Sequence, residues 1–113
     1  LVSKACMVGD GRKFLTMIIA LDDEEAPAWA EARGIAYTDL ASFAKHPEVE
    51  AEIKQAIDEA NESVARVEQV KKWVIVGDAW TPDSGEVTPS LKLKRRVVLE
   101  KYADEIEKMY QGV

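Results

Sequence analysis

The sequence predicts a small α+β domain, in which a short sheet of about three main strands, a hairpin plus one, is covered by helices. Two observations favour this class. Apolar runs of strand length lie near the start and in the second half of the chain, and amphipathic stretches of helical length separate and follow them. With 113 residues, of which 47% are hydrophobic and 32% charged, the chain can form one hydrophobic core. We therefore expect a single domain over residues 1–113.

The first predicted element is a β-hairpin. Val2–Val8 and Lys13–Leu21 are apolar runs, and residues 9–12 between them read Gly-Asp-Gly-Arg, which supplies glycines for a tight turn. The second run is apolar almost throughout, as is typical of a central strand that is buried on both faces. Cys6 falls in the first run, where we expect a buried structural thiol rather than a nucleophile.

A helix is predicted to follow the hairpin. Residues 22–25 are four consecutive acids, and negative charge is favourable at the N-terminus of a helix. Pro27 is tolerated in a first turn, and Gly34 is expected to end the helix. Adjacent carboxylates on a helix point in different directions, so we expect no metal site in this run.

Residues 35–45 are predicted to form a loop and turn before a long helix. Pro47 suits a first helical turn, and an amphipathic pattern runs from Glu48 to about Val67. Its apolar positions recur at helical spacing: Val49, Ile53, Ala56, Ile57, Ala60, Val64 and Val67. This pattern predicts that one side of the helix packs on the sheet.

Two acid–base pairs on the other side of this helix are expected to support it. Glu50 and Lys54, like Glu62 and Arg66, are spaced four residues apart. His46 is the single histidine and directly precedes the helix. At that position we expect a turn residue rather than a metal ligand or a catalytic base.

The last third of the chain predicts a strand, a loop and a terminal helix. Lys72–Val76 is the third strand, and residues 77–85 form a loop rich in Gly, Asp, Thr, Pro and Ser. Residues 86–91 are expected to run extended. A helix from about Arg95 to Gln111 is predicted to pack one side on the core: Val98, Tyr102, Ile106 and Met109.

The most distinctive stretch is residues 87–96, Val-Thr-Pro-Ser-Leu-Lys-Leu-Lys-Arg-Arg. The net charge of the chain is −6, yet Lys92, Lys94, Arg95 and Arg96 place four of its fifteen basic residues within five positions. Such a segment could present a long cationic side chain to an anionic partner. A solvated basic patch is the alternative that charge runs more often form. One short basic strip on an acidic chain does not predict binding to nucleic acid.

Residue sets that could catalyse a reaction alone are not found in the sequence. One histidine at a helix start does not support a Ser-His-Asp triad, and neither a Cys/His cluster for a metal nor a phosphate-binding glycine loop is present. Carboxylates are abundant, but none is marked as a buried pair. The residues by themselves therefore indicate a binding or accessory domain.

Residues 90–96 resemble the C-terminal lysine motif of the adenylate-forming superfamily, and in particular that of the long-chain fatty acid–CoA ligases, Leu-Thr-Pro-Thr, then Leu or Met, then Lys-Leu-Lys-Arg. The match has no gap and sets Lys92 at the catalytic lysine. Residues 1–21 resemble the opening hairpin of the same C-terminal domain, and residues 98–102 its last helix. Where most of the superfamily has Gly before the lysine, this chain has Leu91, as the long-chain branch has Leu or Met.

The resemblance implies a two-step reaction. A fatty acid and ATP with Mg²⁺ give acyl-adenylate and pyrophosphate, and CoA then gives the thioester. This domain would supply Lys92 and alternate between two orientations against its own N-terminal domain, which holds the ATP and acyl sites. Lys94 competes for the catalytic role, because strand alternation places it on the same face. Lys94, Arg95 and Arg96 either contact CoA phosphates or the other domain, or merely flank the motif.

A stand-alone α+β interaction or regulatory module, which docks an anionic partner through its basic strip, is the alternative. Because Leu1 is not a methionine and already resembles the entrance to a strand, we expect a C-terminal part of a longer polypeptide that is inactive alone. No apolar run approaches the roughly 20 residues of a membrane-spanning helix, although peripheral membrane contact of the whole protein stays open. The single cysteine fits a cytoplasmic location.

Overall fold

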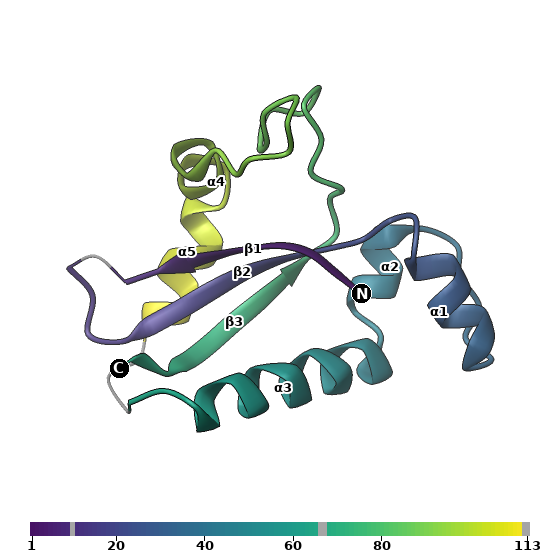
Figure 1. Cartoon of the computed structure of the whole chain (residues 1–113), viewed down its shortest axis with the longest axis horizontal. Helices are drawn as coiled ribbons and strands as arrows, with labels where there is room; N and C mark the ends of the chain where they lie inside the picture. The colour runs from purple at the N-terminus through teal and green to yellow at the C-terminus, as the bar shows by residue number, and fades with distance from the viewer. Residues whose placement is uncertain (10, 66–67, 112–113) are drawn as a thin grey trace.

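The computed structural model describes residues 1–9, 11–65 and 68–111, and within them it has the α+β architecture that the sequence predicts. A three-stranded sheet lies in the middle, with helices on both faces (Figure 1). The strands are β1 (Val2–Val8), β2 (Leu15–Leu21) and β3 (Val70–Val76), in the order β1-β2-β3. β1 pairs antiparallel with β2, and β2 pairs parallel with β3, so the predicted hairpin is confirmed.

The central strand β2 is buried on both faces, as its apolar run predicts. Ile18 and Ala20 point into the core on one side of the sheet, whereas Ile19 and Leu21 point into the core on the other side. All four side chains are at most 1% exposed. The strand begins at Leu15, two residues later than the sequence predicts.

One buried polar side chain interrupts the apolar character of β2. Thr16 is 0% exposed, and its hydroxyl donates to the hydroxyl of Tyr110 at 3.2 Å. The Tyr110 hydroxyl in turn donates to the carbonyl oxygen of Phe14 at 2.7 Å. The buried hydroxyl is therefore satisfied, as buried polar groups must be, and the end of the chain is tied to the start of β2.

The helices α1 (Ala26–Ala32), α2 (Leu40–Ala44) and α3 (Pro47–Glu62) belong to one layer and pack on one side of the sheet (Figure 1). The predicted start of α1 is confirmed, although the acids precede the helix, where Asp22 accepts a hydrogen bond from the N–H of Glu24 at 2.9 Å. Gly34, at φ 69°, follows its end, as predicted.

The predicted loop over residues 35–45 was wrong in part, because it contains α2. Asp39 caps this helix: its carboxylate accepts from the N–H of Ser42 at 2.7 Å, and this bond lowers the pKa of Asp39. Burial of Leu40 and Phe43 stabilises a helix too short for periodicity to reveal. His46 lies in the turn after α2, as expected, where its ring Nδ1 accepts from the first turn of α3.

The long helix α3 ends earlier and buries less than predicted. It stops at Glu62, while Val67 and Arg66 lie outside the described residues. Its buried side chains are Val49, Ile53 and Ile57, and the predicted Ala56 and Ala60 are exposed. Lys54 forms its ion pair with Asp58 at 2.8 Å rather than with Glu50. Beyond the buried turns, the Asn61 side chain bonds both the N–H and the carbonyl of Val70, which ties the end of the helix to β3.

The other face of the sheet is covered by α4 (Arg95–Lys101) and α5 (Ala103–Tyr110), which were predicted as one helix. The helix is broken at Tyr102, which has φ −108° and ψ 25°. The predicted core side chains are nevertheless all buried there: Val98, Tyr102, Ile106 and Met109. They pack against Cys6, whose burial raises the pKa of its thiol, as expected for a structural cysteine.

Candidate functional site

The cationic run begins on a tight turn rather than on the extended segment predicted for residues 86–91. The N–H of Leu91 donates to the carbonyl oxygen of Thr88 at 2.8 Å, which closes a four-residue turn. The extended prediction was wrong because Pro89 occupies the second position of this turn, where its fixed φ is favourable. We call residues 86–94 the lysine hairpin.

Both arms of the lysine hairpin are paired. Val87 and Leu93 form an antiparallel bridge. Thr88 pairs twice with Lys92, because its N–H donates to the Lys92 carbonyl at 2.8 Å and its hydroxyl accepts from the Lys92 N–H at 3.0 Å. The backbone of Lys92 is therefore held on both sides, although its side chain is exposed.

Leu91 has a backbone conformation that favours glycine. Its φ is 63°, and it is the only non-glycine residue with a positive φ among those that the structure describes. This left-handed conformation costs an L-residue about 1–2 kcal/mol. The position before Lys92 is therefore the one where a glycine would fit the backbone without strain.

We predict that Leu91→Gly raises the free energy of unfolding by about 0.5–1 kcal/mol. Removal of the strain exceeds the entropy that glycine gains in the unfolded chain, and little packing is lost because Leu91 is 56% exposed. Leu91→Val should instead lower stability, since a β-branched residue suits this φ less well. Urea unfolding of the two variants measures both effects. Equal losses in both would contradict the prediction.

The two lysines of the hairpin point away from the core, as strand alternation predicts. Leu93 is half-buried against the core, while Lys92 and Lys94 on either side of it are exposed. Within the described residues, neither ammonium group has an ion-pair or hydrogen-bond partner. Both charges are therefore available to an anion.

The two arginines that follow are already engaged. The guanidinium of Arg95 donates to the carbonyl oxygen of Met7 and lies 3.5 Å from the sulfur of Cys6, so it fastens the start of α4 to β1. Arg96 points to solvent and pairs with Glu100 at 3.3 Å. The four cations of the run thus divide into two free lysines, one anchoring arginine and one surface pair.

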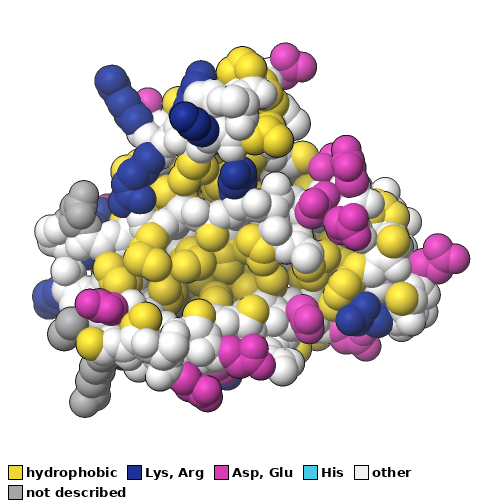
Figure 2. Space-filling model, in the orientation of Figure 1, with side chains coloured by type: hydrophobic (Ala, Val, Ile, Leu, Met, Phe, Trp, Pro, Cys, Tyr) yellow, Lys and Arg dark blue, Asp and Glu magenta, His cyan; other side chains and the backbone are white. Residues whose placement is uncertain are grey.

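Charge is unevenly distributed over the molecule. Figure 2 shows Lys and Arg side chains gathered over the part that holds α4, while Asp and Glu side chains lie over the right and lower parts, where α1 and α3 are found. Lys92 and Lys94 directly precede α4, which begins with Arg95 and Arg96, so positive charge is concentrated here on an acidic domain. Such a surface attracts an anionic ligand without making the whole domain bind polyanions.

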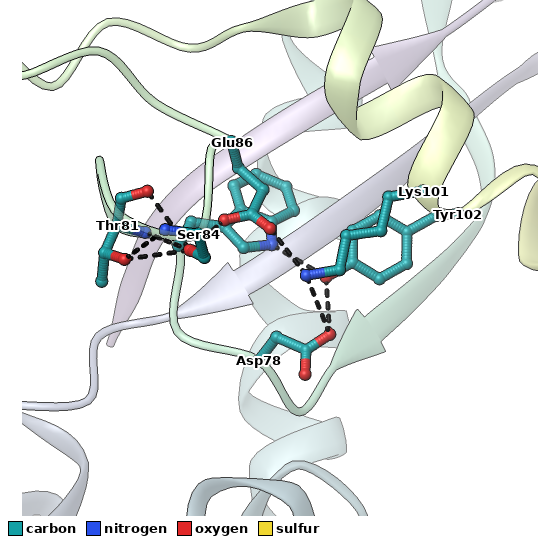
Figure 3. Close-up of polar contacts among 7 residues, drawn as sticks. Asp78, Thr81, Ser84, Glu86, Lys101 and Tyr102 are labelled. Atoms are coloured by element: carbon teal, nitrogen blue, oxygen red, sulfur yellow. Dashed lines mark hydrogen bonds and ion pairs between the residues drawn. The ribbon is translucent and has the colours of Figure 1, made fainter.

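An ion pair with a buried carboxylate and a partly exposed lysine lies at the base of the lysine hairpin. Glu86 is 0% exposed, and its carboxylate accepts from Lys101 Nζ at 2.6 Å and from the hydroxyl of Ser84 (Figure 3). Burial by itself would raise the pKa of Glu86, but the hydrogen bonds from Lys101 and Ser84 outweigh it, and the pKa is lowered. The same contact raises the pKa of Lys101. Glu86 is thus held as a buried carboxylate.

A second set of contacts extends this network into the core. The Tyr102 hydroxyl donates to Asp78 at 2.8 Å and accepts from the indole N–H of Trp80 at 3.0 Å. Lys101 also lies 3.8 Å from the Asp78 carboxylate. Burial, together with the bond to Asp78, raises the pKa of Tyr102 to about 12. The break between α4 and α5 occurs at the residue that makes these contacts.

We predict a loss of stability in alkali that depends on Tyr102. Its folded pKa lies above the ordinary value of 10, so the stabilisation is complete below pH 10 and is lost as the pH rises toward 12. A rise of two pKa units corresponds to about 2–3 kcal/mol of the free energy of unfolding. Urea unfolding of the wild type and of Tyr102→Phe at pH 9 and 12 measures this loss of stability. If both proteins lost the same free energy of unfolding between the two pH values, the prediction would be contradicted. The slope that remains in Tyr102→Phe includes Cys6 and Lys101, since the pKa of each is also raised in the folded state.

The sequence did not reveal this network. Glu86 lies in a stretch predicted to be extended, and Lys101 falls on a helix at a position that resembles an ordinary surface lysine. A glutamate directly before the apolar Val87 was the only local signal, and it is weak. The pair depends on the path of the loop before Glu86, which periodicity does not predict.

Among the residues that the structure describes, no group of three His, Cys, Asp or Glu side chains is placed to hold a metal ion. None of the described helices is both long and apolar enough to cross a membrane.

The whole chain, residues 1–113, matches the family model described as the AMP-binding enzyme C-terminal domain. The chain belongs to this family. The long-chain-fatty-acid–CoA ligase FadD15 of Mycobacterium tuberculosis is 37% identical over 111 residues, which cover 97% of this chain and 18% of that protein. The long-chain-fatty-acid–CoA ligase ACSBG2 of Gallus gallus is 32% identical over 127 aligned residues, which cover 97% of this chain and 17% of that protein.

A solved structure shares the fold of this AMP-binding enzyme C-terminal domain. It is the adenylation domain of a carboxylate reductase from Mycobacterium chelonae, with a TM-score of 0.62 and 19% identity over 97% of this chain and 16% of that one. The chain thus spans less than one fifth of the length of the proteins that it matches. The alternative of a stand-alone regulatory module gains no support from these matches.

Proposed function

We propose that the chain is the C-terminal domain of an AMP-forming long-chain fatty acid–CoA ligase and that Lys92 is its adenylation lysine. The family match and the ligases named above support the reaction class. The observation that carries the role of Lys92 is its geometry: its backbone is held by two hydrogen bonds to Thr88, and its ammonium group has no partner among the described residues. Such a group can act as a preorganised charge.

The proposed first step is the attack of the fatty acid carboxylate oxygen on the α-phosphorus of ATP. The new bond gives acyl-adenylate, and pyrophosphate leaves with the electrons of the broken P–O bond. Two anions must approach, and Lys92 would bridge the carboxylate and phosphate oxygens as charge concentrates between them. Mg²⁺ would enter with ATP as part of the substrate.

In the proposed second step, the thiol of CoA attacks the acyl carbon, and AMP leaves. The domain would turn relative to its N-terminal domain so that a different face meets the acyl-adenylate. Lys94 is exposed on the same face as Lys92 and is the competing catalytic residue. For Arg96, which points to solvent, contact with CoA phosphates or with the other domain stays a proposal. Arg95 would act there only if it left Met7.

The test uses the full-length polypeptide that contains this chain. We expect long-chain fatty acids to support exchange of pyrophosphate into ATP, and CoA to be required for thioester release. The 113-residue chain alone should do neither, because the proposal assigns the ATP and acyl sites to the N-terminal domain. The proposal also places the enzyme in the cytoplasm. Acyl-CoA formation by the isolated chain, or no fatty acid-dependent exchange by the full-length protein, would overturn the proposal.

A further inference from the structure

Glu86, whose carboxylate is buried, is also the first residue of the lysine hairpin. Its backbone carbonyl accepts from the N–H of Lys94 at 2.7 Å, so Glu86 and Lys94 form the outermost rung of the hairpin. The next residue, Val87, is 1% exposed and pairs with Leu93. Glu86 is therefore the residue at which the hairpin joins the body of the domain.

The partner of Glu86 lies on the element that leaves the hairpin. Lys101 is the last residue of α4, and α4 begins directly after Lys94. The ion pair joins residues fifteen positions apart, and the loop that it closes contains Lys92 and all of α4. Figure 3 shows Glu86 and Lys101 pointing toward one another from the loop and the helix. One contact thus fixes the orientation of the hairpin relative to the helix.

An ion pair with one buried partner contributes little net stability by itself. Removing two charges from water offsets most of their attraction, and well-packed apolar side chains often stabilise a fold as well or better. The advantage of a hydrogen-bonded ion pair is that it fixes geometry. It forms only over a narrow range of distances and angles, whereas apolar side chains can pack in several arrangements. The remaining carboxylate oxygen is also bonded, to Ser84, so the orientation of Glu86 is fixed on both sides.

We propose that the Glu86–Lys101 pair is a positioning device that sets where the lysine hairpin presents Lys92 during adenylation. This inference rests on the proposed function. In this proposal neither residue acts on the substrate directly. They act through the backbone pairing that leads from Glu86 and Lys94 to Thr88 and Lys92. A displacement of about 1 Å at a reacting group can cost on the order of 100-fold in rate, so the pair should affect the first half-reaction.

The test measures both half-reactions in the full-length protein. Glu86→Gln keeps the size of the side chain and an acceptor for Ser84 but removes the charge that holds Lys101. We expect it to lower the rate constant for acyl-adenylate formation about 10-fold or more, with the KM for ATP within about 3-fold. Thioester formation from supplied acyl-adenylate and CoA should stay within about 2-fold of wild type. Lys101→Arg, which keeps the charge, should retain most of the adenylation rate.

Lys54→Met is the matched control, because it breaks an exposed ion pair on α3. Melting curves of all variants report the folded fraction. Equal losses in both half-reactions, in proportion to the folded fraction, would show a merely structural pair and overturn the inference. Adenylation by Glu86→Gln at the wild-type rate would overturn it as well. If Lys92→Ala itself leaves adenylation unchanged, the proposed role of Lys92 fails, and the positioning role fails with it.

Discussion

Replacement of Lys92 by alanine is expected to lower the rate of acyl-adenylate formation by about 10²–10³-fold, by analogy with the loss of one preorganised donor from an oxyanion site. The removed ammonium group would bridge two anions as they approach, and no other cation of the run has the same position. Thioester formation from supplied acyl-adenylate should continue, because Lys92 would no longer face the reacting atoms in that step. Single-turnover assays of the two half-reactions measure both effects.

Lys94→Ala is the matched control for this prediction. Lys94 is exposed on the same face two residues away, has the same charge and also lacks a partner within the described residues. A general loss of positive potential would affect the two variants alike, whereas a defined bridging role affects Lys92 alone. If Lys94→Ala loses the adenylation step and Lys92→Ala does not, the catalytic lysine is Lys94.

Lys101→Met is expected to destabilise the domain by about 1–3 kcal/mol, because it leaves the buried Glu86 carboxylate without its countercharge. The cost stays below that of a fully buried pair, since the Lys101 side chain is 39% exposed. Glu86→Gln should cost less, since the ammonium group of Lys101 stays near solvent and near Asp78. In the double variant, the uncompensated charge is gone, and most of the stability should return. Urea unfolding of the wild type, both single variants and the double variant measures the coupling.

The pH dependence of Lys101→Met supplies a second measurement. In the wild type the pKa of Glu86 is lowered, so its contribution is present above the ordinary pKa and is lost as the pH falls. Without Lys101, burial dominates and the pKa of Glu86 rises. The loss of stability of Lys101→Met relative to the wild type should therefore be smaller at pH 4.5 than at pH 7. Lys54→Met, at an exposed pair, should cost at most about 1 kcal/mol at either pH. Equal costs for the two lysine variants would contradict the prediction.

Periodicity predicted the parts of the fold that are long and apolar. The nearly continuous apolar run of β2 revealed a strand buried on both faces, and the spacing of Val98, Tyr102, Ile106 and Met109 revealed the core side of α4 and α5. These patterns can be read from the sequence without knowledge of the fold, because the spacing of apolar residues within one helix or strand indicates which of its faces are buried.

The errors lie where a local contact outweighs periodicity. The Asp39 side chain caps the five-residue α2, and the hydroxyl of Tyr102 engages Asp78 at the break between two helices. Neither contact leaves a repeating pattern. In the proposed site, the motif singles out Lys92, whose catalytic role stays a prediction, and both Lys92 and Lys94 are exposed, as alternation predicts. The turn before them is local, and Pro89 was a signal for it that the extended prediction did not use. The ion pair of Glu86 depends on Lys101, fifteen positions away, which no short window along the chain contains.

The hydrogen bond between Thr16 and Tyr110 has a consequence for strand pairing. Because β2 is apolar on both faces, sliding it by one residue against its neighbours would exchange Ile18 with Ile19 at little hydrophobic penalty. Thr16 is the position at which that exchange is costly, since its hydroxyl would lose Tyr110. Together with the turn between β1 and β2, one hydroxyl group on α5 therefore helps to fix the alignment of the central strand, and with it the placement of the residues packed on the sheet.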